Sequence, residues 1–197
     1  FWAGDRIEEG VPLVIGQHGG NYGQALFNMG EYHELKICDY YLSWGWKSKT
    51  DKVIPVGIFK KSLNNKRRLD DNASILLILS VACRYNGGIQ SIPASSQWID
   101  YLDDQVEFYE KLPDCVSNNV TVRLYPHDFK WSQFERWKDK FPNSKIDECE
   151  KDFNKAIKNT NLLISGWNTT AYLESMMSNI PTIIFWKPKY FEIRKDA

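Results

Sequence analysis

The sequence predicts a layered α/β protein built on largely parallel, Rossmann-like sheets. Short apolar runs recur along the 197 residues, and amphipathic stretches of helical length separate most of them. This alternation is typical of β-α-β units. The composition agrees, because 43% hydrophobic and 14% aromatic residues supply a core and exclude the class of disordered chains.

Seven strands are expected, and each is a short apolar run. Their ranges are 12–16, 37–42, 53–58, 75–81, 120–125, 161–165 and 181–186. All of them are much shorter than the about 20 apolar residues that cross a bilayer. The sequence therefore predicts no transmembrane segment.

Helices are expected between several of these strands. Over residues 97–109, apolar side chains recur at spacings of three and four, which predicts an amphipathic helix. The range 148–158 follows the same pattern. Another helix is expected to begin near Tyr22, and a further helix is expected to run to Met177.

Residues 61–73 are polar, charged and without any period, so we interpret them as a linker. Residues 1–60 are then expected to be the last part of one α/β domain, and residues 74–197 most of a second one. The chain starts without a methionine and without a leader, which favours a piece of a longer protein.

Charge and cysteine content narrow the classes of partner. The 25 basic and 25 acidic residues give zero formal net charge, so nucleic acid is not expected as a partner, and a small molecule or another protein is. The four cysteines are dispersed and the histidines are not clustered. We therefore predict neither a metal site nor a disulfide framework.

The first candidate site is the glycine-rich stretch that follows the strand at 12–16. Gly19 and Gly20 allow backbone N–H groups to approach a ligand, and a helix starting near Tyr22 would direct its positive end at a phosphate or carboxylate. His18 would lie at the carboxyl end of the strand, where open α/β sheets bind ligands. The alternative is a structural turn in which the histidine bonds to the backbone.

The second candidate site follows the strand at 161–165. Asn168 or Thr169 is a plausible N-cap, and the free N–H groups of the helix, with the Thr169 and Thr170 hydroxyls, form an anion cradle. Glu174 lies four residues after Thr170, where its carboxylate could accept from ribose or sugar hydroxyls. The alternative is a well-capped helix without a ligand. The candidate residues are Ser165, Gly166, Asn168, Thr169, Thr170 and Glu174.

The third candidate site combines Arg123 and His127 around a strand that a proline ends. The planar guanidinium of arginine suits phosphate, and the imidazole could donate to the same group. An ordinary loop histidine is the alternative.

Several motifs together resemble a known family. The stretches "GQHGGNYG", "EYHELKICDYYLSWGW", "KVIPVG", "VRLYPHDF" and "SGWNTTAYLESMMSNIPTIIFW" resemble transferases of bacterial surface-carbohydrate (polysaccharide and O-antigen) gene clusters and, more distantly, GT-B glycosyltransferases. The resemblance covers nearly the whole chain. It implies two Rossmann-like domains and transfer from a nucleotide-activated sugar to a glycan or lipid-linked acceptor.

The resemblance also implies roles for individual residues. His18 would act as a general base on the acceptor or as a donor to the leaving phosphate, and both roles stay open. Thr169, Thr170 and Glu174 would lie near the donor phosphates and the sugar or ribose. No metal or further cofactor is implied, and the expected location is the cytoplasm, with peripheral association at the inner face of the membrane as an option.

Two other functions remain open at this stage. A nucleotide-sugar epimerase of the same build would convert its substrate without an acceptor. A non-catalytic scaffold of a polysaccharide assembly complex would need no polar residues at the strand ends, although the sequence places several there.

Overall fold

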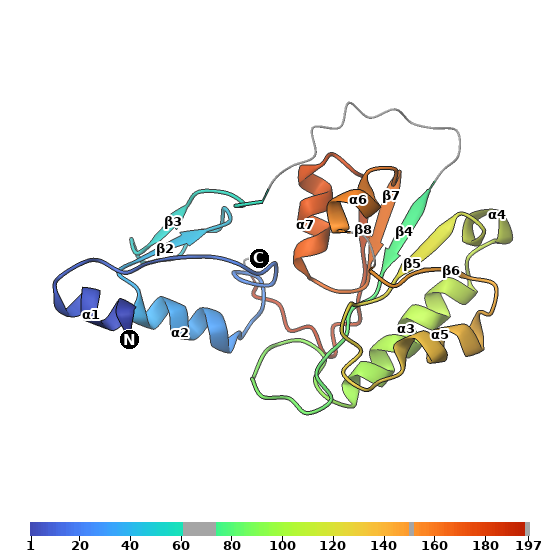
Figure 1. Cartoon of the computed structure of the whole chain (residues 1–197), viewed down its shortest axis with the longest axis horizontal. Helices are drawn as coiled ribbons and strands as arrows, with labels where there is room; N and C mark the ends of the chain where they lie inside the picture. Colours follow the sequence, from blue (N-terminus) through green and yellow to red (C-terminus); the bar gives the residue numbers. More distant parts are fainter. Residues whose placement is uncertain (61–73, 150–151, 196–197) are drawn as a thin grey trace. The chain divides into compact units, whose positions relative to one another are not determined.

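The computed structural model describes residues 1–60, 74–149 and 152–195. The described chain forms two compact units (Figure 1). We call residues 1–60, 88–91 and 192–195 the smaller unit, and residues 74–87, 92–149 and 152–191 the larger unit. Each unit contains its own parallel sheet, which confirms the α/β class. The predicted linker, 61–73, lies outside the described residues.

The sheet of the larger unit has five strands. They are β4 (Ile75–Ile78), β5 (Val120–Arg123), β6 (Lys145–Asp147), β7 (Leu162–Ser165) and β8 (Thr182–Ile184). The spatial order is β6-β5-β4-β7-β8, and all neighbouring pairs are parallel. Counted from β4 this order is 3-2-1-4-5, as in the Rossmann fold, so the direction of winding reverses between β4 and β7.

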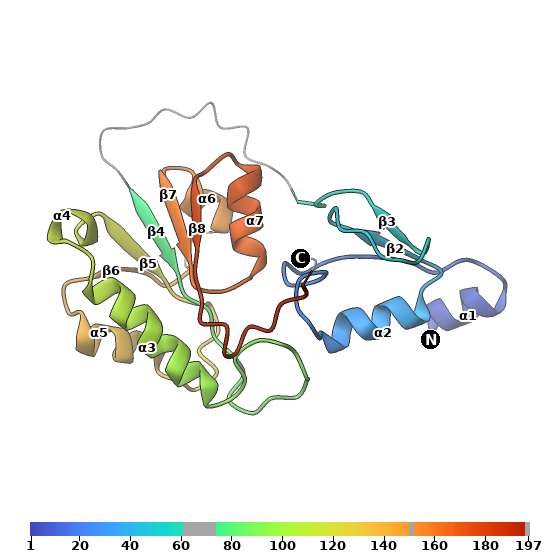
Figure 2. The same ribbon diagram turned by 180° about the vertical axis from the view of Figure 1, so that it is seen from behind.

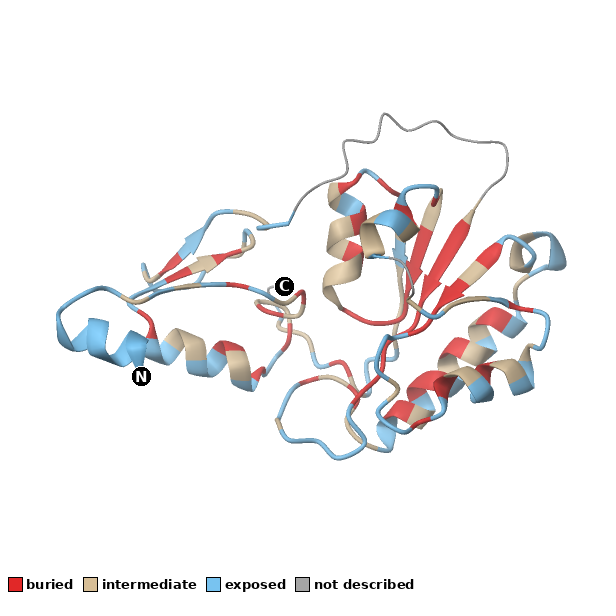
Figure 3. Cartoon of the chain, in the orientation of Figure 1, coloured by how far each residue is buried: buried red, intermediate tan, exposed pale blue. Residues whose placement is uncertain are grey.

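Helices cover both faces of this sheet (Figures 1 and 2). One face packs against α3 (Gln97–Glu110) and α5 (Gln133–Lys140), and the other against α6 (Phe153–Ile157) and α7 (Thr170–Met177). Because side chains alternate along a strand, β4 contributes to both layers. All four of its residues are buried (Figure 3), as expected for a central parallel strand. The short helix α4 (Asp114–Ser117) contributes no buried residue.

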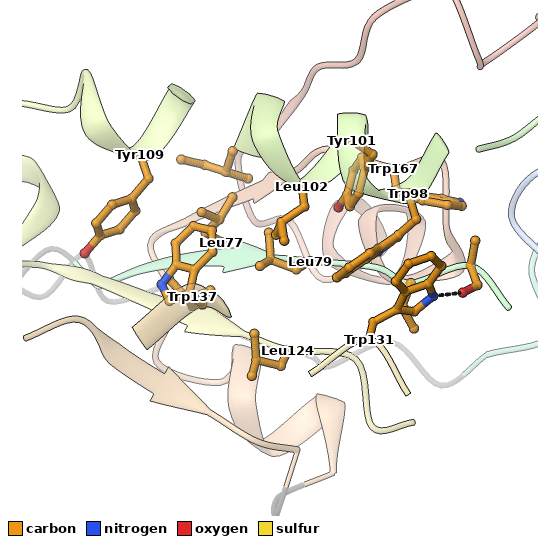
Figure 4. Packing of buried hydrophobic residues seen from close by; sticks show 14 of the residues in the cluster. Leu77, Leu79, Trp98, Tyr101, Leu102, Tyr109, Leu124, Trp131, Trp137 and Trp167 are labelled. Carbon is orange, nitrogen blue, oxygen red and sulfur yellow. Dashed lines mark hydrogen bonds between the residues drawn. The ribbon is translucent and has the colours of Figure 1, made fainter. Parts of the chain in front are cut away.

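Aromatic side chains of α3 and of the loop before α5 hold the chain that leaves β4 (Figure 4). The Trp98 and Trp131 rings lie 4.9 Å apart, between centroids. Trp98 donates its indole N–H to the Ser80 carbonyl at 2.9 Å, and Trp131 donates to the Ala82 carbonyl at 2.8 Å. These bonds fix the backbone just after the carboxyl end of β4.

The smaller unit has a three-stranded parallel sheet in the order β1-β2-β3. Its core contains Tyr22, Cys38, Tyr41 and Val53, against which Leu35 of the second helix packs. The first helix buries no residue. The elements are α1 (Trp2–Glu8), β1 (Val14–Gly16), α2 (Met29–Ile37), β2 (Tyr40–Ser43) and β3 (Val53–Pro55).

Two segments that are distant in the sequence complete the smaller unit. The Leu26 N–H donates to the Glu192 carbonyl at 2.8 Å, and the Ser91 N–H donates to the Phe27 carbonyl at 2.9 Å. The Arg194 guanidinium forms an ion pair with Glu31, whose side chain is buried. Residues 88–91 and 192–195 therefore belong with residues 24–31, although the sequence places them beside the larger unit.

The prediction that a helix begins near Tyr22 is wrong. Residues 20–24 form a turn, and α2 begins only at Met29. Gly23 has a φ of +76°, a left-handed conformation that interrupts a helix. Asn28 is the N-cap, because its side chain accepts from the Glu31 N–H, so the start signal lies several residues after the predicted one.

Other boundaries also differ from the prediction. The helix α2 continues to Ile37, so β2 begins at Tyr40 and not at residue 37. The strand β6 is short and contains two charged residues, and the prediction missed it because only one of its residues is apolar. The helices α1, α4 and α5 were not predicted either.

Candidate functional site

The turn between β7 and α7 carries the second motif. Thr169 is the N-cap of α7, and its hydroxyl accepts from the Ala171 N–H at 3.3 Å. The Ser165 hydroxyl donates to the Trp167 carbonyl at 2.8 Å and closes the turn. The first-turn N–H groups of a helix have no intrahelical partners and carry partial positive charge. This turn therefore presents hydrogen-bond donors beside a capped helix.

Asn168 lies directly before this cap with its hydrogen-bonding capacity unused. The residue is 1% exposed, and neither its Nδ2 nor its Oδ1 has a partner among the described residues. Leaving a buried amide unsatisfied costs about 1–3 kcal/mol. Such groups are normally satisfied by ordered water or by a bound ligand.

Gln105 of α3 lies against the same turn, and the sequence did not predict its involvement. Its side chain is buried, and its Oε1 has no partner within the described parts of the chain. A Cβ on Gly166 would come within 2.3 Å of this amide, so the glycine allows the close approach. No local signal identifies Gln105, because a helix pattern does not show which distant turn the helix will contact.

The turn lies at the point of the sheet where open α/β folds bind ligands. Ser165, the last residue of β7, is in register with Ile78, the last residue of β4, and the strand order reverses between these two strands. Ligands bind outside the carboxyl ends of the strands at such a reversal. Thr170 and Glu174 are partly exposed and, four residues apart, share one face of α7.

Arg123 and His127 lie at and after the carboxyl end of β5. Arg123 is buried and forms an ion pair with Asp147 of β6, so a carboxylate already offsets its charge. His127 is exposed, and its ring centroid lies 6.4 Å from that of Tyr125 and 6.2 Å from that of Phe129. Of this pair, only the histidine is open to solvent.

The loop that carries His127 has an unusual backbone. Phe129, Lys130 and Ser132 have φ values of 48°, 65° and 53°, in the left-handed region that non-glycine residues rarely adopt. Asp128 accepts from the N–H groups of Ser132 and Gln133 at 2.9 and 2.7 Å and holds the loop in this form. Strain of this kind gathers at functional loops.

His18 of the smaller unit lies two residues after β1, as the motif predicts. Its side chain is 66% exposed, and its Nδ1 lies 3.6 Å from Glu34 Oε1. Its Nε2 lies 3.2 Å from the Tyr22 hydroxyl oxygen, and the two rings meet edge to face. Gly19 gives the Tyr22 ring room, because a Cβ there would come within 2.9 Å of it, and Gly20 is buried.

Glu34 of α2 receives hydrogen bonds from two tyrosines. Tyr22 donates to Oε1 at 3.3 Å, and Tyr41 donates to Oε2 at 3.4 Å. Burial, and next the charge of Glu34, raise the pKa of both tyrosines above the ordinary value. The two phenols therefore remain protonated donors at neutral pH.

Gln17 joins the histidine loop to the loop after β2. Its Nε2 donates to the Gly19 carbonyl at 2.7 Å, while its Oε1 accepts from the Trp44 N–H at 2.9 Å and from the Trp46 indole at 2.8 Å. The side chain is buried. The side chain of Gln17 thus links the "GQHGG" and "SWGW" stretches of the sequence.

The predicted site residues therefore form three groups, of which Arg123 and His127 at the end of β5 are one. The larger unit brings together Ser165, Gly166, Asn168, Thr169, Thr170 and Glu174, and adds Gln105. The smaller unit holds His18, Gly19 and Gly20, and adds Gln17, Tyr22 and Glu34. Gln105 and Glu34 come from other segments, so no local pattern indicates them, whereas Gln17 and Tyr22 belong to the quoted "GQHGGNYG" stretch itself.

A cavity of about 390 Å³ also lies in the larger unit, at the α6 face of the sheet. Its lining includes Thr121, Asp147, Glu148 and Lys155, and none of the predicted site residues. Asp147 and Glu148 are carboxylates, and their negative charge would repel an anionic ligand such as a phosphate. We therefore place the candidate site at the β7–α7 turn and not in this cavity.

The described residues contain neither a metal-binding cluster nor a membrane-spanning helix. Among residues 1–60, 74–149 and 152–195, no group of three or more His, Cys, Asp or Glu could hold a metal ion. No helix within the same ranges is long and apolar enough to cross a membrane.

Comparison with known proteins places the chain in a family. No curated protein and no solved structure matches it significantly. A family model described as LIC12162 family transferase matches residues 1–197, which is the whole sequence. The chain therefore belongs to the LIC12162 family of transferases.

Proposed function

We propose that this protein transfers a sugar from a nucleotide-activated donor to a hydroxyl of a glycan or lipid-linked acceptor during bacterial surface-polysaccharide synthesis. The membership of a transferase family supports the reaction class. The choice of donor rests on the chemistry of the β7–α7 turn and on the resemblance of the motifs to GT-B glycosyltransferases.

The observation that carries the proposal is the unsatisfied amide of Asn168. It is buried directly before the cap of α7, at the reversal point of a sheet with Rossmann strand order. A helix N-terminus binds phosphate through its N–H groups and its dipole. An amide beside it can donate to a phosphate oxygen and accept from a sugar hydroxyl at the same time.

In the proposed complex, each group of the turn has a separate task. The first-turn N–H groups and the Thr169 and Thr170 hydroxyls hold the diphosphate, and they stabilise the charge that grows on it as the sugar leaves. The Glu174 carboxylate accepts from hydroxyls of the ribose or the sugar. Ser165 and Gly166 keep the turn close to the sheet.

We further propose a GT-B-like division of labour between the units. The larger unit belongs to the domain that binds the donor, and the smaller unit belongs to the other domain, which supplies His18. His127, whose ring lies near those of Tyr125 and Phe129, would donate to a phosphate of the donor, with Arg123 beside it. The proposed location is the cytoplasm, with peripheral contact at the inner face of the membrane.

Nucleotide binding to the full chain tests this proposal. Thermal-shift and calorimetric titrations with UDP, GDP, CDP and CMP should identify one nucleotide that stabilises the protein, by about 2.7 kcal/mol at 100 times its Kd. The variant Thr170→Val removes the hydroxyl and keeps the shape, whereas Thr170→Ser keeps the hydroxyl. We expect Thr170→Val to bind more weakly and Thr170→Ser to bind like the wild type.

The reaction itself is tested next with the matching nucleotide sugar. A transferase releases free nucleotide mainly when an acceptor is supplied. Conversion of the sugar without an acceptor would replace the transferase by an epimerase. Absence of binding by every nucleotide, with the fold intact, would contradict the proposed donor site.

A further inference from the structure

The loop between β5 and α5 presents two aromatic rings to solvent. Tyr125 is 37% exposed and Phe129 is 39% exposed. Their ring centroids lie 6.3 Å apart, with 26° between the ring planes, and the His127 ring lies edge to face beside both. Large apolar side chains that gather on a surface indicate an interaction site.

Side chains from two other segments hold the backbone of this loop. Gln133 is buried; its Nε2 donates to the Tyr125 carbonyl at 2.7 Å, and its Oε1 accepts from the Tyr125 N–H at 3.2 Å. Arg84, from the loop after β4, donates to the Lys130 carbonyl at 2.9 Å. The two exposed rings are therefore carried on a fixed backbone, so a ligand that packs on them does not have to order the loop.

The exposed charges beside the rings are basic. Arg84 and Lys130 are exposed. Asp128 is the only acidic residue in the ranges 83–87 and 124–132, and its carboxylate already accepts from two backbone N–H groups. This charge complements an anionic ligand. We use the name aromatic-basic surface for Arg84, Tyr125, Phe129 and Lys130.

The aromatic-basic surface lies near the proposed donor site and in the same unit. Only β4 separates β5 from β7 in the sheet. Neighbouring strands are about 4.8 Å apart, so the carboxyl ends of β5 and β7 are about 10 Å apart. In the proposed function the β7–α7 turn holds the phosphates of the donor. A second set of cationic groups, beside two aromatic faces, therefore points to another anionic ligand.

We propose that the aromatic-basic surface binds the acceptor, and that this acceptor is an anionic glycan whose sugars carry carboxylate or phosphate groups. The inference rests on the proposed transferase function and adds the class of acceptor. The C–H bonds of a sugar ring carry partial positive charge and pack on the negative face of an aromatic ring. Tyr125 and Phe129 supply such faces, and the two basic side chains pair with the anionic groups.

The first test is titration calorimetry of the full chain with glycans and without nucleotide. The probes are trigalacturonate, maltotriose that carries a phosphate ester, and plain maltotriose. We expect the anionic probes to bind, and maltotriose to bind about tenfold more weakly, a difference of about 1.4 kcal/mol. Salt should weaken the binding of the anionic probes, because it screens the charges. The tighter anionic probe shows whether carboxylate or phosphate is preferred.

Variants of the aromatic ring test the surface itself. Tyr125→Leu should weaken the tighter anionic probe by about fivefold or more, as for a central aromatic contact of an interface. Tyr125→Phe keeps the ring and should bind like the wild type. Because Tyr125 is exposed, both variants should keep the unfolding midpoint, which separates lost binding from lost folding.

A charge variant tests the basic side chains. Lys130→Gln should weaken binding of the anionic probe and leave binding of maltotriose unchanged. Lys111→Gln is the matched control, because it removes the same charge from an exposed residue just after α3. The helix α3 begins beside the loop after β4 and has 14 residues, which places Lys111 about 20 Å from that loop. This control should bind both probes like the wild type.

Several results would overturn the inference. They are no binding of either anionic probe, equal affinity for maltotriose and the anionic probes, and unchanged affinity in Tyr125→Leu. Tighter binding of uridine, cytidine or guanosine than of any glycan would also overturn it, since the surface would then be a nucleobase site. None of the variants changes the β7–α7 turn, so failure of the nucleotide titration alone would contradict the proposed donor site and leave the glycan surface in place.

Discussion

The side-chain amide of Gln105 occupies the space that a Cβ on Gly166 would need. Such an atom would lie 2.3 Å from both Nε2 and Oε1 of Gln105, and both residues are buried. This contact joins the middle of α3 to the turn that precedes α7. The conformation of the candidate donor site therefore depends on a helix that lies much earlier in the sequence.

Replacing Gly166 should damage this contact. We expect Gly166→Ala to lower the free energy of unfolding by about 1–3 kcal/mol, the usual cost of an overpacked core position, and to weaken nucleotide binding. Urea denaturation and calorimetry measure the two effects. A matched control is Gly87→Ala, because nothing lies within 4 Å of a Cβ at that residue.

A double-mutant cycle shows whether the Gln105 amide is the cause. If it is, Gln105→Ala combined with Gly166→Ala should recover part of the lost stability, so that the two changes couple favourably. Additive losses would show that the alanine methyl collides with another part of the core.

Gly23 is predicted to be the most sensitive glycine of the smaller unit. It has a φ of +76°, and a Cβ would approach the Trp46 ring to 2.4 Å. Gly23→Ala therefore combines backbone strain of about 1–2 kcal/mol with a steric clash. Gly57 has a φ of +97° and nothing within 4 Å, so Gly57→Ala should show the strain alone. Equal losses in the two variants, measured by urea denaturation, would contradict the clash.

The ion pair between Arg123 and Asp147 should contribute to stability through its burial. The Arg123 side chain is 8% exposed and that of Asp147 20% exposed. Asp147→Asn removes the carboxylate charge that pairs with this buried guanidinium, which should cost about 3 kcal/mol or more. The exposed pair of Glu107 and Lys111 is the control, because Glu107→Gln should leave the unfolding midpoint unchanged. A small loss in Asp147→Asn would contradict a stabilising role of this pair.

Alkaline pH should destabilise the protein through its buried tyrosines. Burial raises the pKa of Tyr22, Tyr41 and Tyr101 in the folded state, whereas in the unfolded state a tyrosine titrates near its ordinary value of about 10. Above that pH the unfolded chain loses protons that the folded chain keeps, so stability falls as the pH rises. The loss is at most about 1.4 kcal/mol per pH unit for each such tyrosine.

Unfolding midpoints measured from about pH 8 to about pH 11, a range that spans the ordinary tyrosine pKa, check this expectation. The variant Tyr41→Phe removes one titrating group and should have a shallower decline than the wild type above that ordinary value. A decline of unchanged slope would mean that Tyr41 ionises in the folded protein as it does in the unfolded one.

Local patterns predicted the elements of the larger unit best. The helix expected at 97–109 is α3, Gln97–Glu110, and the helix expected to end at Met177 is α7, Thr170–Met177. Both helices have an apolar face long enough to show the helical period in the sequence. Both bury that face against the sheet. The short strand β6 and the helix α2 were missed or displaced, because their limits depend on a neighbouring strand and on the cap at Asn28.

The sequence by itself determined the α/β class, the strand-turn-helix that carries Thr169 and Thr170, and the place of His18 just after a strand. These features follow from side chains that are neighbours along the chain. Only the tertiary structure decided that Gln105 meets Gly166, that Glu34 and Tyr22 surround His18, and that Asp147 pairs with Arg123. These contacts form when separate segments bury their apolar faces together. The local residue pattern of one segment does not show which other segment it will contact.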